Sequence, residues 1–392
     1  MRLHIAFPVL LFSILSSLSA GLTKQDAQAF QESLWKTYQA TVRKDRAGEM
    51  KKKVIRIGEH AMLFESKKYG KKPKGGWSLF ISMHGGGGAP ARVNDSQWKN
   101  QVRLGDAYKP KDAIYVAPRA PTNTWNLWHQ GHIDKFFDRL IENLVVLEGV
   151  NPDKVYFMGY SAGGDGAYQL APRMADRLAG AAMMAGHPNE TSPLGLRNIA
   201  FALHVGEKDH GYKRNSVAAE WKKKLAKLHA ADPGGYQNQV QIHRGKGHWM
   251  GLQDRVAIPW LQKFTRDPLP GKVVWKQDDV LHDSFYWLGM PKGKAKKGQL
   301  VVASLDGQTI RIEKAEGVGQ FLVRVNDGML DMDKPLRILG LDGDTLFEGV
   351  VERSKETAER TFAARHDLAL TFFAELLVDL NAKKANRTKP TE

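Results

Sequence analysis

Short runs of consecutive apolar residues, separated by stretches long enough for a helix, recur through the first two thirds of the chain and restrict its fold most. The six runs cover residues 79–83, 114–117, 155–158, 179–185, 199–205 and 240–242. Strands buried on both faces have continuous apolar sequences of this kind, whereas half-buried strands alternate. The pattern therefore predicts an α/β fold, in which a mostly parallel sheet is flanked by helices.

Two further elements precede these runs. Residues 54–57 and 61–65 alternate on either side of Gly58, which is typical of an antiparallel hairpin. With the six runs, the hairpin makes a sheet of about eight strands. Upstream, Thr23 stands before apolar residues spaced three or four apart, which predicts a capped N-terminal helix that packs on the core.

The pattern changes after residues 267–271, which contain two prolines and a glycine. Beyond this break, shorter alternating runs surround Asp-Gly turns at 306–307 and 342–343. The sequence therefore predicts three parts after its leader. They are an α/β catalytic domain with its N-terminal helix (22–270), a smaller β-rich domain (271–382) and a mobile polar tail (383–392).

Residues 1–21 have the organisation of an export signal. Arg2 and His4 precede an apolar stretch at 5–18, and the small residues Ser19 and Ala20 follow. We expect cleavage at one of the bonds near these small residues, and a secreted or periplasmic mature protein. An uncleaved anchor is the alternative. No later segment is apolar enough to span a bilayer, and the absence of cysteine is compatible with export.

The chain is strongly basic. Its 58 Lys and Arg against 42 Asp and Glu give a formal charge of +16, which attracts anionic partners at long range. The lysines fall in short runs with little aromatic interleaving, and no nucleic-acid-binding motif accompanies them. We therefore expect mostly solvated surface and no nucleic-acid partner, with an anionic polysaccharide or a membrane headgroup as the alternative.

The strongest motif is the segment 159–164, Gly-Tyr-Ser-Ala-Gly-Gly, which follows the apolar run at 155–158. A G-x-S-x-G pattern between a strand and a helix is typical of a nucleophile elbow, a sharp turn that exposes the serine hydroxyl at a helix N-terminus. Alone the match is weak, because Gly and Ser are common in such turns. Ser161 is the candidate nucleophile, and its support lies in partners elsewhere in the chain.

A glycine-rich loop precedes the elbow. His84 and four glycines at 85–88 end the apolar run at 79–83, and such a loop presents backbone N–H groups to an oxyanion. Gly86 and Gly87, together with Ala162, are the predicted donors. A flexible turn or a phosphate-binding loop are the alternatives, but neither the Lys-Ser/Thr of a P-loop nor G-x-G-x-x-G spacing is present.

A serine hydroxyl is a weak nucleophile near neutral pH and needs a base that an acid orients. Asp209 comes shortly after the run at 199–205, and His248 comes shortly after the run at 240–242. The chain order Ser161, Asp209, His248 is the one expected after an elbow and differs from that of both classical serine protease families.

Other assignments of acids and histidines fit less well. Asp165 is too near Ser161 in sequence to orient the base, and Glu207 lies two residues early. His129 and His132 are spaced as metal ligands, yet no third ligand has helpful spacing, so we interpret them as ordinary loop histidines. No metal or cofactor is expected. Three acidic residues also miss the calcium-loop spacing, namely Asp327, Asp331 and Asp333.

Taken together, the glycine loop, the elbow, the acid and the base resemble the α/β-hydrolase superfamily. The phrase at 151–164, NPDKVYFMGYSAGG, is similar to its secreted feruloyl-esterase, polyhydroxyalkanoate-depolymerase and dienelactone-hydrolase-like branch. The resemblance covers about residues 54–266 and does not extend to the C-terminal region. It implies an α/β-hydrolase fold and a catalytic triad acting on acyl substrates, without choosing among esterases, peptidases and thioesterases.

We therefore expect an exported serine carboxylic-ester hydrolase acting on small-molecule or polymer-linked esters, such as acyl or feruloyl esters of polysaccharides. Trp125, Trp128, Tyr160 and Trp249 are candidate pocket residues, with core packing as the alternative. A prolyl-oligopeptidase-like serine peptidase stays open, although only about 30 residues lie between the expected export signal and the hairpin, too few for a propeller. A non-catalytic polysaccharide-binding protein also stays open. In the β-rich domain, contact with a polysaccharide and core packing are equal alternatives for Trp275, Phe285, Tyr286 and Trp287.

Overall fold

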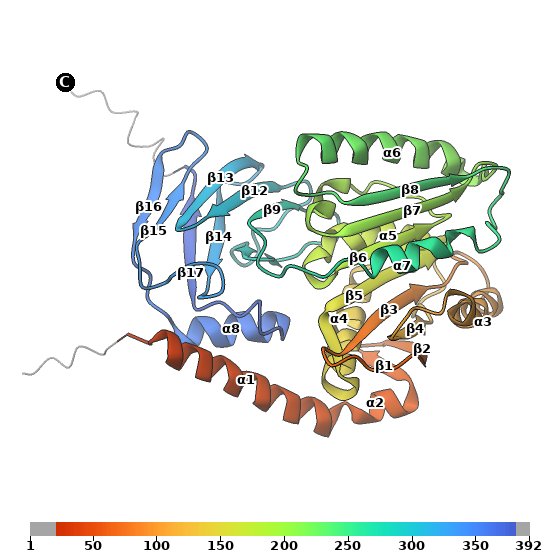
Figure 1. Ribbon diagram of the computed structural model, residues 1–392, viewed down its shortest axis with the longest axis horizontal. Coiled ribbons are helices and arrows are strands. Elements are labelled where there is room, and N and C mark those ends of the chain that lie inside the picture. The colour runs from red at the N-terminus through yellow and green to blue at the C-terminus, as the bar shows by residue number, and fades with distance from the viewer. Residues whose placement is uncertain (1–20, 382–392) are drawn as a thin grey trace, which may run out of the picture.

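The computed structural model describes residues 21–381, so the predicted export signal up to residue 20 and the predicted polar tail lie outside the described residues. Eight strands form one sheet in the order β1-β2-β4-β3-β5-β6-β7-β8 (Figure 1). β2 is antiparallel to β1 and to β4, and the other neighbours are parallel. The strands are β1 (Val54–Ile57), β2 (His60–Tyr69), β3 (Trp77–Met83), β4 (Ala113–Pro118), β5 (Val150–Tyr160), β6 (Gly180–Met184), β7 (Ala200–Gly206) and β8 (Asn238–His243). This is the predicted α/β-hydrolase fold.

Helices cover both faces of the large sheet (Figure 1). One face carries α4 (Gly131–Glu148), α5 (Ala162–Arg173) and α6 (Arg214–Ala231), and the other carries α3 (Ala91–Tyr108) and α7 (Ala257–Leu261). Along β5, Val155 and Phe157 belong to the core on the first face, whereas Tyr156 and Met158 belong to the core on the second. Since both faces are apolar, the strands have the continuous runs seen in the sequence.

The predicted N-terminal helix is confirmed as α1 (Lys24–Asp45), and the Thr23 hydroxyl caps it by accepting the Asp26 N–H at 3.1 Å. A short helix that the sequence did not predict, α2 (Ala47–Lys52), leads from it into β1. In Figure 1, α1 runs along the lower edge of the molecule, where it contacts α4 and the C-terminal α8 (Lys355–Arg365). It therefore ties the α/β part to the C-terminal part.

The C-terminal region is β-rich, as predicted. Its strands form a five-stranded sheet, β16-β15-β13-β12-β9, and a four-stranded sheet, β10-β11-β14-β17. The bounds are β9 (Lys272–Lys276), β10 (Ser284–Phe285), β11 (Leu288–Gly289), β12 (Leu300–Asp306), β13 (Thr309–Glu316), β14 (Gln320–Val325), β15 (Leu336–Leu339), β16 (Thr345–Gly349) and β17 (Ala374–Asp379). Just before β17, the Phe372 N–H donates to the Thr361 hydroxyl of α8 at 3.0 Å.

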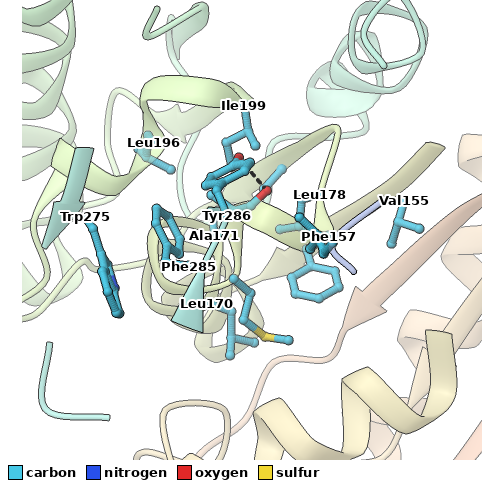
Figure 2. Close-up of a cluster of buried hydrophobic side chains, with 14 of the residues drawn as sticks. Val155, Phe157, Leu170, Ala171, Leu178, Leu196, Ile199, Trp275, Phe285 and Tyr286 are labelled. Atoms are coloured by element: carbon cyan, nitrogen blue, oxygen red, sulfur yellow. Dashed lines mark hydrogen bonds between the residues drawn. The ribbon is translucent and has the colours of Figure 1, made fainter. Parts of the chain in front are cut away.

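The two parts share one hydrophobic core. Figure 2 shows Trp275, Phe285 and Tyr286 beside apolar side chains of the α/β part. These rings and Trp287 are at most 3% exposed, and the Tyr286 hydroxyl donates to the Ala175 carbonyl at 2.9 Å. Of the two alternatives for these rings, core packing is therefore confirmed and contact with a polysaccharide is wrong, because a ligand cannot reach them. The apolar side chains of the α/β part labelled there are Val155, Phe157, Leu170, Ala171, Leu178, Leu196 and Ile199. The domain boundary at 270 stays a prediction.

Buried ion pairs reinforce this join. Arg266 pairs with Asp153 at 2.8 Å and with Asp367 at 2.7 Å, and Arg365 pairs with Asp176. The neighbouring carboxylates raise the pKa of Arg266, which stays charged despite its burial. Removing one partner from such a pair costs about 3–5 kcal/mol, because it leaves the other charge buried and unpaired. Within residues 21–381, no helix combines the length and apolar composition needed to cross a membrane.

We expect Tyr286→Ala to lower the free energy of unfolding by about 3–5 kcal/mol, because it leaves a cavity where the two parts meet. Tyr286→Phe, which loses only the hydrogen bond, should cost about 1 kcal/mol. Urea unfolding followed by circular dichroism measures both. Leu377→Ala, at a side chain 57% exposed, is the control and should change little. Equal stabilities for Tyr286→Ala and the control would show that the join carries no stability.

Candidate active site

Three polar side chains meet at the carboxyl ends of the parallel strands. Ser161 directly follows β5, while Asp209 follows β7 and His248 follows β8. Ser161 Oγ lies 3.0 Å from His248 Nε2, and His248 Nδ1 lies 2.8 Å from Asp209 Oδ2. The structure thus brings together the three residues that the sequence predicted, in an unbroken hydrogen-bonded relay. With its proton on Nδ1, His248 donates to Asp209 and accepts from the serine hydroxyl.

The turn that carries Ser161 is strained. Ser161 has φ 58° and ψ −121°, in the left-handed half of backbone space that non-glycine residues rarely occupy. Two glycines make room for this turn: a Cβ on Gly159 would lie 2.0 Å from the Gly163 carbonyl oxygen, and one on Gly163 would lie 2.1 Å from the Met83 carbonyl oxygen. The turn places the Ser161 hydroxyl at the N-terminus of α5, where the helix dipole stabilises negative charge.

The loops that carry the acid and the base touch each other at a glycine. A Cβ on Gly206 would lie 2.0 Å from the Gly247 carbonyl oxygen, so only glycine lets these loops approach this closely. Asp209 is 3% exposed, whereas the His248 side chain is 45% exposed. The acid is therefore shielded from water, and the base is open to it.

Tyr160 fixes the His248 loop. Its hydroxyl donates to the His248 carbonyl at 2.7 Å and accepts the Met250 N–H at 3.0 Å. Its burial raises the pKa of the phenol well above its usual value, so the hydroxyl stays protonated and can donate. The sequence placed Tyr160 near the site only as a pocket residue, because nothing in the chain shows that its hydroxyl reaches residue 248.

Neither alternative acid contacts His248. The Glu207 carboxylate accepts the Gly245 N–H at 2.7 Å, which fixes the turn after β8. Asp165 accepts the His187 N–H at 2.6 Å, and burial raises the pKa of its carboxyl to about 6. The geometry therefore agrees with the choice of Asp209 over both.

The glycine loop approaches Ser161 closely. Gly86 and Gly87 have φ of 115° and 121°, and a Cβ on Gly85 would lie 3.1 Å from the Ser161 Cβ. The Gly87 N–H, however, donates to Asn94 Oδ1 at 3.0 Å, so this predicted oxyanion donor is already used. The Gly86 N–H forms no hydrogen bond with the rest of residues 21–381, and Ala162 presents its N–H at the open end of α5. These two remain the candidate donors.

Asn94 clamps the loop, and the sequence did not single it out. Besides accepting from Gly87, its amide donates to the Gly87 carbonyl at 3.0 Å and to Asn123 Oδ1 at 3.0 Å. Asn94 is 0% exposed although it lies in the first turn of α3. A buried asparagine in a helix is unusual, and the only signal in the sequence was its position just after the glycine loop.

His84 and Trp128 support the loop from beneath. His84 is buried, which lowers its pKa to about 4, so the ring is neutral near pH 7. Its Nε2 accepts the Ala120 N–H at 3.1 Å. The Trp128 indole is fully buried and donates to the His84 carbonyl at 2.9 Å. The prediction that Trp128 lines the pocket is therefore wrong, since its ring fills the core below the loop.

We expect Asn94→Ala to lower kcat about tenfold to a hundredfold, because the released loop no longer holds the Gly86 N–H toward the oxyanion. KM should change less. Steady-state kinetics on a soluble aryl ester measures both. Lys99→Ala, on the exposed side of the same helix, is the control and should match the unmodified protein. A normal kcat in Asn94→Ala would remove the clamp from the account of catalysis.

Two pockets open beside Ser161. One, of about 610 Å³, is lined by Ser161 and His248, by Tyr160 and Trp249, and by one side of α3. The other, of about 390 Å³, is lined by Ala162, Trp125 and the segment 212–214. Of the two candidate oxyanion donors, Gly86 lines both pockets and Ala162 lines the smaller one. Trp125, Tyr160 and Trp249 therefore lie where the sequence predicted, on pocket walls.

Few groups in the described residues suit a metal. His129 is buried, packed edge-on to Trp125, and its burial lowers its pKa to about 4, while His132 stacks on His60. Asp327, Asp331 and Asp333, whose spacing does not match a calcium-binding loop, lie in the C-terminal part. Arg353 pairs there with Asp327 and Asp333. Within residues 21–381, one cluster of three carboxylates could share a cation. It consists of the exposed Glu190 and Asp279 and the half-buried Asp278. None of these three lines either pocket beside Ser161.

No protein-family model and no curated protein matches the sequence. Solved structures to which the chain is similar include a thermostable esterase, at 16% identity over 54% of this chain and 62% of that one, with a TM-score of 0.42. Esterase PE8 is 18% identical over 52% of this chain and 98% of that one, with a TM-score of 0.38. An acetyl xylan esterase from Aspergillus awamori is 12% identical over 51% of this chain and 93% of that one, also with a TM-score of 0.38. The match spans less than two thirds of the thermostable esterase. The α/β-hydrolase fold of this chain is defined by its own strand order and by the elbow after β5.

Proposed function

We propose that the protein is a serine hydrolase that cleaves carboxylic esters. The observation that carries this proposal is the relay from Ser161 through His248 to Asp209, with contacts of 3.0 and 2.8 Å, at the mouth of a pocket. A neutral imidazole at this distance can take the serine proton as the oxygen attacks a carbonyl carbon. A buried carboxylate on the other ring nitrogen holds the tautomer that this step requires.

The reaction proceeds in two halves. Ser161 Oγ bonds to the ester carbonyl carbon while its proton passes to His248 Nε2, and the carbonyl oxygen becomes an oxyanion that the Gly86 and Ala162 N–H groups stabilise. The C–O bond to the alcohol then breaks, and His248 returns the proton to the departing oxygen. In the second half, water attacks the acyl carbon while His248 takes its proton. The bond between the acyl carbon and Ser161 Oγ then breaks, His248 returns the proton to Oγ, and the carboxylic acid is released.

Export and action on acyl or feruloyl esters of polysaccharides remain part of the proposal. Two exposed rings support a bulky or polymer-linked substrate, because Trp125 is 64% and Trp249 is 54% exposed at the two pockets. Exposed aromatic faces at a binding site suit the faces of aromatic or sugar rings. A serine peptidase with the same triad is the second candidate.

The test is a panel of acetyl, short-chain aryl, feruloyl and polymeric esters beside aminoacyl and prolyl-peptide anilides. We expect the esters to be turned over and the anilides to be hydrolysed at least about a hundredfold more slowly, since an amine is the poorer leaving group. A fluorophosphonate label mapped by peptide should be found on Ser161. Efficient anilide hydrolysis would favour the peptidase, and no label with no turnover would refute a serine hydrolase.

A further inference from the structure

The smaller pocket beside Ser161 has features that ester hydrolysis alone does not require. It is formed by the glycine loop and Ala162, by Trp125, by Asp165, by residues 187 and 189, and by the segment 212–214 at the start of α6. Because Ala162 follows the nucleophile and lines the pocket, this pocket lies within reach of a substrate held at Ser161.

Backbone strain concentrates on its wall. Asn189, Tyr212 and Lys213 all line the pocket, and their φ angles are 53°, 53° and 56°, left-handed values that cost free energy in non-glycine residues. Such strain is retained where a particular side-chain position serves a function. Here it holds the Tyr212 ring, which is 79% exposed, out at the pocket mouth, where Trp125 is also exposed.

The same segment brings positive charge to the pocket. Lys213 is exposed and forms no ion pair within the described residues. Arg214 is mostly buried, with its guanidinium 4.8 Å from the centre of the Tyr212 ring and Nη1 3.8 Å from Asp209 Oδ1. Its Nε is a buried donor without an acceptor in the described chain, as is Asn189 Nδ2 on the same wall. Since α6 begins at Arg214, its N-terminal dipole adds to the positive potential.

Two carboxylates oppose these charges. Asp209 Oδ1 lies 3.8 Å from Arg214 Nη1, so these two charges offset each other. Asp165 lines the pocket, where it accepts the His187 N–H at 2.6 Å, and its burial raises its pKa to about 6. The exposed charge at the mouth is therefore that of Lys213, which no carboxylate neutralises. A ligand carboxylate would pair with this exposed ammonium, whereas a neutral ligand would leave it unpaired.

We propose that this pocket binds a carboxylate of the substrate, with Lys213 and Arg214 as its cationic contacts and with Trp125 and Tyr212 against the adjoining ring or chain. This rests on the proposed function and narrows its substrate class to esters that carry a free acid group close to the scissile bond. The acid belongs either to the acyl part, as in a half-ester of a dicarboxylic acid, or to the alcohol part, as in an ester of a uronic or hydroxybenzoic acid.

Two substrate pairs distinguish these sources. In the first, 4-nitrophenyl hydrogen adipate is compared with its neutral methyl ester, so that the charge lies on the acyl side. In the second, 4-carboxyphenyl acetate is compared with phenyl acetate, so that the charge lies on the alcohol side. The readout is the ratio of kcat/KM, anionic over neutral, within each pair. We expect a ratio of about ten or more in one pair at low salt, falling as NaCl screens the charges.

Variants assign the preference to the pocket. Lys213→Gln and Arg214→Gln should each lower the favoured ratio about threefold to tenfold. Because Arg214 also approaches Asp209, its variant lowers turnover of both members of a pair, and the ratio removes that common effect. Lys222→Gln removes one charge from the exposed side of the same helix and is the matched control, for which the ratio should stay unchanged.

The outcomes separate this inference from the proposed function. Turnover of the neutral esters with ratios at or below one in both pairs overturns the carboxylate pocket and leaves the hydrolase in place. A ratio that Lys222→Gln lowers as much as Lys213→Gln overturns it too, since net charge alone then explains the preference. If no ester is hydrolysed and Ser161 takes no fluorophosphonate, the hydrolase fails and the pocket assignment fails with it.

Discussion

Ser161→Ala should lower kcat about 10⁴- to 10⁶-fold, the loss expected when the nucleophile of a triad is removed. The effect is this large because the hydroxyl makes the bond to substrate and no other side chain can replace it. The other groups of the relay stay in place, and the oxyanion donors and the pockets survive, so some rate above that of water should persist. KM should change little, since alanine removes no group that binds the ground state.

A stopped-flow or steady-state assay on a soluble aryl ester measures this loss, with protein concentration checked by absorbance and folding checked by circular dichroism. Ser96→Ala is the matched control, because Ser96 is exposed on α3 and lines neither pocket. A fluorophosphonate should label the control and the unmodified protein and leave Ser161→Ala unlabelled. If Ser161→Ala kept more than about a tenth of the rate, another nucleophile would have to be sought.

Asp209→Asn is the second large effect, with an expected loss of about 10⁴-fold in kcat. The amide has nearly the same shape, but it can donate to His248 Nδ1 and so stabilises the tautomer whose proton is on Nε2. That tautomer cannot accept the Ser161 proton. The amide also removes the negative charge that stabilises the imidazolium formed during attack. The loss should lie in kcat, with substrate binding little affected.

Glu207→Gln is the control for this variant. Glu207 lies two residues from Asp209 and binds the Gly245 N–H instead of His248, so its neutral analogue should keep most of the activity. A pH profile adds a further readout, because a hydroxide-dependent recovery of Asp209→Asn at high pH would reflect attack without the relay. Were Glu207→Gln the inactive variant and Asp209→Asn the active one, the acid of the triad would be reassigned.

Particular residues show how far a sequence of this kind predicts its own fold. The continuous apolar runs predicted six of the eight strands because burial on both faces leaves a continuous pattern, and the alternating hairpin predicted the other two. Thr23 marked the start of α1 because its hydroxyl satisfies an N–H that the helix cannot. The short α2 left no periodicity to detect. For Phe285 and Tyr286 the sequence could not decide between contact with a ligand and core packing, because an aromatic ring has the same sequence pattern in both. The structure shows that both rings are buried.

The site divides in the same way. Ser161, Asp209 and His248 could be named from the sequence because each follows a strand, and parallel strands bring their carboxyl ends to one edge. The contacts of Asn94 with the glycine loop could not be predicted from the sequence, since they join a side chain of α3 to the backbone of the loop before it. The same holds for the Tyr160 bridge and for the pocket between Trp125 and Arg214.

By itself the sequence determined which segments form strands, where the elbow lies and in which order the three triad residues occur. These features depend on local backbone preferences and on burial along single strands. Only the tertiary structure decided which N–H groups are free, which rings are buried and where charges gather. Those properties depend on distances between segments far apart in the chain, which packing sets and periodicity does not record.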